Sequence, residues 1–433
     1  MPDASEVNME SRLLSERAED FGELVPASHP RPLGDDDIRE ALRRPIWAGG
    51  AGPVFSRVKP GERVCVVVSD HTRRTATDRV LPLLVEGLAQ SGCSPADVFL
   101  LVASGIHRHP KPDEVRRILG EVMARRFEGR LFMHDPDDDR NLVAVGATPR
   151  GHEVRLNRLA VEADRLILIG TVTYHYHAGF GGGRKSLVPG LAARATIAYN
   201  HSLTLDPAAD RIDPRVEIGV MDGNPVAEEM AAGARLRPPD FIVNTVLTPS
   251  GELVGAFAGD MDAAHRAACR RAEDVSRVDI ARRADFVVAR ADSASNWIQS
   301  HKALFNASRA VRPDGRIVLV APCPDGIGDE RFRYWIRQPS ADDICRGLRN
   351  SPEVLGQTAL STKVRGARTI LVTRMAAGDA ADLGIETAPT LADAVAMTLA
   401  RLEPRGGGKP SCYRMPHALH TVPFGVSCCA AAR

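Results

Sequence analysis

The chain has 433 residues, 44% of them hydrophobic and 26% charged, a composition typical of a soluble globular protein with two or three domains. Lys and Arg number 56 against 55 Asp and Glu, so no basic excess exists to bind nucleic acid. No apolar run reaches the ~20 residues of a membrane helix. Residues 1–30 lack a signal-peptide core, which predicts a cytoplasmic protein without membrane contact.

The hydrophobic pattern alternates strands and helices along the chain. Apolar, β-branched runs predict buried strands at 63–68, 98–102, 166–169, 241–243, 286–288, 316–320 and 369–373. Helical periodicity predicts helices at 77–90, 112–119, 261–272, 303–311 and 391–402, with Pro313-Asp314-Gly315 as a turn before a strand. This alternation predicts an α/β protein with mainly parallel sheets.

Composition divides the chain into four parts. We expect a flexible segment over 1–30, an α/β domain over 31–270, a second α/β domain over 271–402 and a flexible tail over 403–433. The tail contains Gly406-Gly407-Gly408 and several prolines and shows no periodicity, so it predicts no regular structure. Two α/β domains in series predict an active-site cleft between them.

The densest group of chemically useful residues runs from 174 to 201. Its GFGGGRKS stretch nearly fits the phosphate-loop pattern GxxxxGK[ST], but Arg184 occupies the place of the final glycine. Read alone, this stretch is a glycine-rich turn with a solvated Lys185. The neighbouring His175, His177 and His201 favour metal or acid–base chemistry instead. A phosphate-loop nucleotide enzyme remains an alternative.

Polar residues also follow the first two predicted strands. Asp70 and Thr72 offer hydrogen bonds to a polar ligand, and Arg73 offers a cation for a carboxylate or phosphate. His107 follows the next strand, at the same sheet edge, where parallel sheets bind ligands. The plainer interpretation is a helix cap with solvated arginines. His134, in an acidic turn, is predicted to be a surface residue.

A third group opens a helix of the second domain. Gln299 and Lys302 are three residues apart and share one helix face, which by itself is most often a solvated face.

These groups together resemble the nickel-pincer lactate racemase family over most of the chain. The motifs, in order, are DHTR at 70–73, GIHR at 105–108, HYHAGFGGGRK at 175–185, PG at 189–190 and NH at 200–201. The resemblance implies a racemase or epimerase of 2-hydroxy acids that moves hydride from substrate C2 to its cofactor and back. It further implies that the first domain binds the cofactor and the second the substrate.

The same resemblance implies roles for single residues. Lys185 would carry nickel and pyridinium-3,5-bisthiocarboxylic acid mononucleotide, the nickel-pincer nucleotide, which dedicated cofactor-synthesis enzymes supply. His201 would be the metal ligand, and His107 and His175 the acid/base pair. Asp70, Thr72 and Arg73 would bind the cofactor, and Arg73, Gln299 and Lys302 would bind the substrate. A non-catalytic carrier of the cofactor is a further alternative, although it needs no pair of bases.

The chain departs from the family's lactate enzymes at three places. Ile298 stands where they have Tyr, residues 291–296 replace a Gly-Tyr-Pro segment, and residues 353–357 lack their Trp. These changes predict a substrate with a larger or more polar side chain than lactate.

Overall fold

The computed structural model describes residues 14, 16–50, 52–402 and 408–425. The chain divides into two compact units. The first unit comprises His29–Thr204 and Ile212–Val275; the second comprises the described residues up to Ser28, Leu205–Arg211 and the described residues from Ser276 onward. The chain therefore enters the second unit briefly, at Leu205–Arg211, before it returns to the first.

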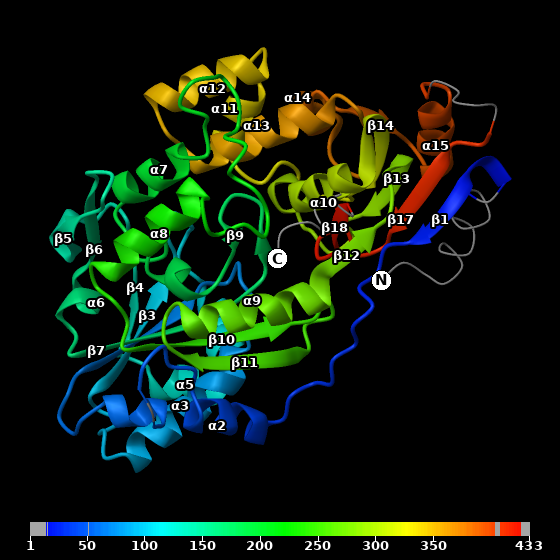
Figure 1. Ribbon diagram of the computed structural model, residues 1–433. Helices are drawn as coiled ribbons and strands as arrows, with labels where there is room; N and C mark the ends of the chain where they lie inside the picture. The colour runs from blue at the N-terminus through cyan, green and yellow to red at the C-terminus, as the bar shows by residue number, and fades with distance from the viewer. Residues whose placement is uncertain (1–13, 15, 51, 403–407, 426–433) are drawn as a thin grey trace. The chain divides into compact units, whose positions relative to one another are not determined.

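The first unit is built on a six-stranded sheet in the order β11-β10-β7-β2-β3-β4 (Figure 1). All neighbours are parallel except β10 and β11, which are antiparallel. The strands are β2 (Val64–Ser69), β3 (Val98–Ala103), β4 (Leu131–Met133), β7 (Arg165–Thr171), β10 (Phe241–Leu247) and β11 (Leu253–Gly259). The predicted α/β class with mainly parallel sheets is confirmed.

Helices cover both faces of this sheet. Figure 1 shows α9 (Ala263–Ser276) along β10 and β11 on one face, with α2 (Asp35–Arg43), α3 (Thr77–Gln90) and α5 (Glu121–Arg126) on the other. The face covered by α2, α3 and α5 forms one hydrophobic cluster that includes Leu42, Leu84, Val66 and Leu100. Because both faces are covered, the central strands are apolar along their whole length and show no alternation.

The other elements of the first unit lie on the connections between these strands and helices. They are η1 (Val54–Arg57), α4 (Pro112–Leu119), η2 (Asp139–Asn141), β5 (Leu142–Ala147), β6 (Glu153–Asn157), α6 (Arg158–Glu162), β8 (Tyr174–His175), β9 (Gly179–Phe180), η3 (Gly183–Ser186), α7 (Arg194–Ser202) and α8 (Pro225–Arg235). His134, expected at the surface, is fully buried after β4. Its Nε2 donates to the Ala192 carbonyl and its Nδ1 accepts from Asn157, which satisfies the ring inside the protein.

The second unit has its own six-stranded sheet, in the order β1-β17-β13-β14-β15-β16, and every pairing in it is parallel. The strands are β1 (Glu19–Glu23), β13 (Ala284–Arg290), β14 (Val311–Val320), β15 (Thr369–Val372), β16 (Glu386–Ala388) and β17 (Ser411–Met415). The remaining elements are β12 (Arg277–Ile280), β18 (Val422–Gly425), α10 (Trp297–Ala310), α11 (Glu330–Ile336), α12 (Ala341–Asn350), α13 (Val354–Gly366), α14 (Ala377–Leu383) and α15 (Leu391–Leu399). The expected turn at residues 313–315 lies within β14, where the register with β13 shifts.

The expectation of a flexible tail is wrong for residues 408–425. β17 lies between β1 and β13, and its Cys412 and Met415 are fully buried. β1 falls in the segment 1–30, which was also expected to be flexible. The hydrogen-bond partners of both strands lie in distant parts of the chain, so the local sequence pattern does not predict these strands. The rest of both segments lies outside the described residues.

Among the described residues, no helix is both long and apolar enough to cross a membrane.

Candidate active site

The topology of the first unit marks one edge of its sheet. The chain leaves β2 towards β3 and leaves β7 towards β10, in opposite directions, although β2 and β7 are neighbours. Such a switch point is where open parallel sheets bind ligands, beyond the carboxyl ends of the strands. Asp70 follows β2, His107 follows β3, and His175 and Lys185 follow β7. The sheet therefore brings these predicted site residues to the edge that is suited to a ligand.

Asp70 and His107 form a hydrogen-bonded pair at this edge. Asp70 is 2% exposed, and its Oδ2 accepts from Nδ1 of His107 at 2.7 Å. Its Oδ1 accepts from the Thr72 amide at 3.0 Å and the Thr72 hydroxyl at 2.6 Å. Because a carboxylate only accepts, the ring hydrogen sits on Nδ1, and Nε2 of the half-exposed imidazole keeps its lone pair. The arrangement makes Nε2 of His107 a proton acceptor.

The charge of Asp70 is stabilised within this pair. Burial alone would raise the pKa of its carboxyl, but the hydrogen bonds from His107 and Thr72 and the charge of Arg73 outweigh it. The pKa of Asp70 therefore lies below its ordinary value. A charged Asp70 can stabilise His107 as an imidazolium, as the buried acid of a catalytic triad does.

The glycine-rich segment does not form a phosphate loop. Its short strands β8 and β9 pair with each other, and the chain then enters the four-residue turn η3. In a phosphate loop the lysine would instead open a long helix whose first amides bind the phosphate. Gly105 donates its amide to the carbonyl of Gly190 at 3.0 Å, so this segment is tied to the loop that carries His107.

His175 is held in the opposite tautomer to His107. Its Nδ1 accepts from the backbone amides of His177 at 3.2 Å and Ala178 at 3.1 Å, so the hydrogen of the neutral ring sits on Nε2. Burial lowers the pKa of His175 well below its usual value, and the positive charge of Lys185 lowers it further. The shift also identifies Lys185 as an electrostatic neighbour of this ring.

His201 has the geometry of a single metal ligand. It lies at the end of α7 and is 7% exposed, and its Nδ1 donates to the carbonyl of Ile197 at 2.8 Å. The lone pair is therefore left on Nε2, the arrangement in which a backbone carbonyl orients a metal-binding histidine. Burial lowers its pKa to about 4, which keeps the ring neutral and able to coordinate at neutral pH.

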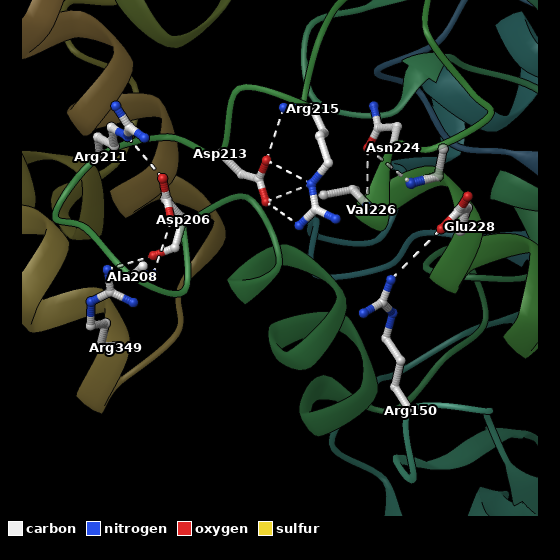
Figure 2. Close-up of polar contacts among 11 residues, drawn as sticks. Arg150, Asp206, Ala208, Arg211, Asp213, Arg215, Asn224, Val226, Glu228 and Arg349 are labelled. Atoms are coloured by element: carbon white, nitrogen blue, oxygen red, sulfur yellow. Dashed lines mark hydrogen bonds and ion pairs between the residues drawn. The ribbon is translucent and has the colours of Figure 1, made fainter.

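The chain that follows His201 is fixed by charged side chains (Figure 2). Thr204 donates its hydroxyl to the carbonyl of His201 at 2.8 Å. Arg349 of α12 donates to the carbonyls of Asp206 at 2.7 Å and Ala209 at 2.6 Å, all within the second unit. Nε of Arg211 donates to the carboxylate of Asp206 at 2.8 Å (Figure 2). The segment after the candidate metal ligand is therefore an ordered connection.

Two asparagines support the glycine-rich segment. Asn224 caps α8 with its Oδ1, and its Nδ2 donates to the carbonyl of His177 at 2.9 Å. Asn244 lies in the interior of β10, where its Oδ1 accepts from the amide of Gly183 at 2.9 Å. No spacing rule connects Asn244 with a loop 61 residues earlier.

The remaining predicted site residues are exposed. Arg73 follows the Asp70 turn, and its charge contributes to the lowered pKa of His175. Gln299 and Lys302 lie in the first turns of α10 in the second unit, where Oε1 of Gln299 accepts from the Ser295 amide at 3.3 Å. Their roles in binding substrate stay predictions.

No group of three or more His, Cys, Asp or Glu that could hold a metal exists among the described residues. A metal at His201 would therefore depend on ligand atoms from an organic cofactor, which fits a metal carried by a nucleotide but not a zinc site built from protein side chains.

Residues 11–211 match the lactate racemase N-terminal domain family. The chain is 31% identical to the lactate racemase of Thermoanaerobacterium thermosaccharolyticum over 70% of this chain and 69% of that protein. It is 31% identical to the lactate racemase of Lactiplantibacillus plantarum over 72% of each chain. The structure resembles the lactate racemase apoprotein from T. thermosaccharolyticum, with a TM-score of 0.82 and 27% identity over 95% of this chain and 96% of that one.

A Thermotoga maritima protein with 18% identity and a TM-score of 0.66 shares the fold. With two lactate racemases above 30% identity across more than two thirds of their length, and the match in structure, the chain belongs to the lactate racemase family of isomerases.

Proposed function

We propose that this racemase inverts C2 of a 2-hydroxy acid by reversible hydride transfer, with His107 as the principal proton acceptor. The observation that carries the proposal is the Asp70–His107 pair at the switch point of the first unit. It supplies an imidazole whose Nδ1 is engaged by a buried carboxylate, which directs Nε2 to act as the acceptor. This is what removing a proton from a substrate hydroxyl requires.

The cofactor we propose is the nickel-pincer nucleotide, which would supply the hydride acceptor. Lys185 would hold it through its amine, and His201 would offer Nε2 to the nickel. Support comes from the tautomer of His201, whose Nδ1 is engaged by the Ile197 carbonyl. Further support comes from the backbone around Lys185: an added Cβ on Gly183 would lie 2.8 Å from His265, and one on Gly182 3.0 Å from Asn244. The backbone next to Lys185 is therefore packed too closely for a side chain at either glycine.

His175 has a second, distinct role in this proposal. In its neutral form Nε2 is a hydrogen-bond donor, so it can hold the substrate oxygen, whereas full proton exchange requires its contacts with the amides of His177 and Ala178 to loosen. Converting the Lys185 amine to a thioamide would also remove the positive charge that, after burial, most lowers the pKa of His175. Cofactor attachment would thus prepare His175 to take part as an acid.

Arg73 would bind the substrate carboxylate by charge, since it is exposed next to the Asp70 turn. Gln299 and Lys302 are proposed to bind the same substrate from the second unit. We propose a substrate with a polar side chain. Support comes from Gln357, which is 1% exposed and whose two amide atoms have no hydrogen-bond partner among the described residues. A buried amide in this state is costly unless a ligand or water satisfies it.

The primary test is the mass of the peptide that contains Lys185, from protein made in a host that synthesises the cofactor. We expect a nickel-linked adduct on Lys185. An unmodified lysine, alongside a modified control racemase from the same host, would refute the proposed attachment of the cofactor at Lys185.

The second test separates catalysis from cofactor carriage. His107→Ala and His175→Ala should abolish racemisation while leaving the Lys185 adduct intact. Full activity in both variants would show that neither histidine is needed as acid or base. Loss of the adduct would show that the assigned roles are wrong.

A panel of 2-hydroxy acids with aliphatic, aromatic and polar side chains tests the substrate. We expect polar substrates to react faster than lactate, and Gln357→Leu to reduce that preference. Reaction with lactate alone would refute this part of the proposal.

A further inference from the structure

Arg184 occupies the position at which the sequence departs from a phosphate loop, and its side chain turns into the protein. It is 6% exposed, although it lies between the loop residues Gly183 and Lys185. A buried guanidinium is costly unless specific partners compensate for its lost hydration. The question is what this arginine does in the interior.

Its hydrogen-bond partner is His265 of α9. Nη1 of Arg184 donates to Nδ1 of His265 at 3.1 Å, and a guanidinium can only donate, so Nδ1 must carry a lone pair. The ring hydrogen therefore sits on Nε2, which donates to the carbonyl of Gly181 at 2.7 Å. One imidazole thus connects the two ends of the Gly181–Arg184 loop. It binds the side chain of Arg184 at one end and the backbone carbonyl of Gly181 at the other.

The loop also packs tightly against this imidazole. A Cβ on Gly183 would lie 2.8 Å from Cδ2 of His265, which is closer than real contacts allow. On its other side, the amide of Gly183 donates to Asn244. Lys185 follows at once, and its own amide donates to the carbonyl of Gly182 at 3.1 Å. The backbone that carries Lys185 is therefore determined by contacts with α9 and β10.

Ion pairing does not explain the burial of Arg184. Among the residues that the structure describes, no carboxylate pairs with it, and its Nε has no hydrogen-bond partner. The neighbouring Arg235 pairs with Asp262 at 2.7 Å, and the neighbouring Arg266 pairs with Asp222 at 2.6 Å. Arg184 therefore differs from the other arginines around the same cavity in that its bond is to the loop-bridging histidine.

We propose that Arg184 and His265 are positioning residues that hold the Gly181–Lys185 backbone in the conformation needed for cofactor attachment at Lys185. We call the two hydrogen bonds of His265, to Arg184 and to the Gly181 carbonyl, the clamp. This inference rests on the proposed function, because it assumes that the cofactor is attached at Lys185. Neither residue is proposed to touch the cofactor or substrate.

The test measures the modified fraction of Lys185 by peptide mass in full-length protein from a cofactor-producing host. Arg184→Met and His265→Leu each remove the clamp and should lower that fraction by about tenfold or more, since each breaks a hydrogen bond to a charged or buried partner. His265→Gln can still accept through Oε1 and donate through Nε2, so it should restore most of the attachment. Arg235→Met, which borders the same cavity but pairs with Asp262 and not with His265, is the matched control.

Amide hydrogen exchange provides the independent readout. We expect faster exchange at residues 181–187 in Arg184→Met and His265→Leu, with unchanged exchange in the central strands and in the Arg235→Met control. Wild-type attachment in both clamp variants, or a loss in His265→Gln equal to that in His265→Leu, would overturn the inference. If wild-type Lys185 is itself unmodified, the proposed function fails, and unchanged exchange in the variants would then refute the clamp separately.

Discussion

Replacing Asp70 by Asn tests whether the tautomer of His107 matters for catalysis. Asn has the same shape, but Oδ1 must still accept the two hydrogen bonds from Thr72, at 3.0 and 2.6 Å. The Nδ2 group then faces Nδ1 of His107, which has to become an acceptor, and the ring hydrogen moves to Nε2. The single substitution therefore removes the lone pair that accepts the substrate proton.

The size of the effect follows from the chemistry. General-base assistance accounts for about 10²–10⁴-fold in rate, and an inverted histidine tautomer in a catalytic triad costs about 10⁴-fold. We therefore expect kcat to fall by about 10²–10⁴-fold, equivalent to about 3–5 kcal/mol of transition-state stabilisation. The modified fraction of Lys185 should stay at its wild-type level because Asp70 does not contact that loop through any hydrogen bond in the described structure.

The assay is the initial rate of interconversion of the enantiomers of the best substrate, measured by chiral chromatography and normalised to modified Lys185. Thr72→Val is the companion variant. It removes the 2.6 Å bond but leaves the carboxylate facing His107, so it should lose only a few-fold in rate, in line with one hydrogen bond. Asp36→Asn, at an exposed ion pair with Arg39 on α2, is the control for the substitution itself.

An Asp70→Asn enzyme within about threefold of wild type would refute the reasoning, since that is far below the range expected for a general base. A loss in Thr72→Val as large as that in Asp70→Asn would show that the position of the turn, and not the tautomer, limits the rate.

Two further predictions concern stability. Gly179→Ala should destabilise the protein by about 2–4 kcal/mol in urea unfolding, because Gly179 has a φ of +71° and an added Cβ would collide with the Val220 carbonyl. Gly61→Ala is the control: its φ is +81° but the space around it is open, so it should cost only about 1 kcal/mol. Equal losses in the two variants would contradict the collision. Burial lowers the pKa of His134 to about 4 against an unfolded value of 6.5, so the unfolded chain binds more protons between these limits. Stability should therefore decrease as the pH is lowered from 6.5 to 4, by up to about 3 kcal/mol for this residue. His134→Leu should lower stability at pH 7 but flatten its dependence on pH from 6.5 to 4, and an unchanged slope would refute the assignment.

Some of the site residues could be located from the local sequence pattern, whereas the contacts of others could not. Asp70 and His107 could be placed at one sheet edge because each directly follows an apolar, β-branched run, and such runs in an alternating α/β chain form neighbouring parallel strands. The hydrogen bond between them was not predicted. It depends on the angle at which each loop leaves its strand, and no spacing rule encodes that angle.

The interior partners of the glycine-rich loop lie further beyond sequence reasoning. Arg184 looked like a defect in a phosphate loop, and its role became visible only through His265, 81 residues later in the chain. The choice of tautomer at His175 and His201 likewise comes from backbone groups that fold against each ring.

The sequence alone determined the order of strands and helices, the α/β class and the set of chemically competent residues. It could do so because hydrophobic periodicity and motif order are local properties of the chain. Only the tertiary structure decided that β17, in a segment without periodicity, completes the second sheet next to β1 and β13. It alone also decided which nitrogen of His107 carries the proton. The pairing of β17 and the tautomer of His107 depend on hydrogen bonds to residues far away in sequence, which form only once the chain has folded. The tautomers of His175 and His201 depend on backbone groups two to four residues away, whose positions are set by the local turn and helix.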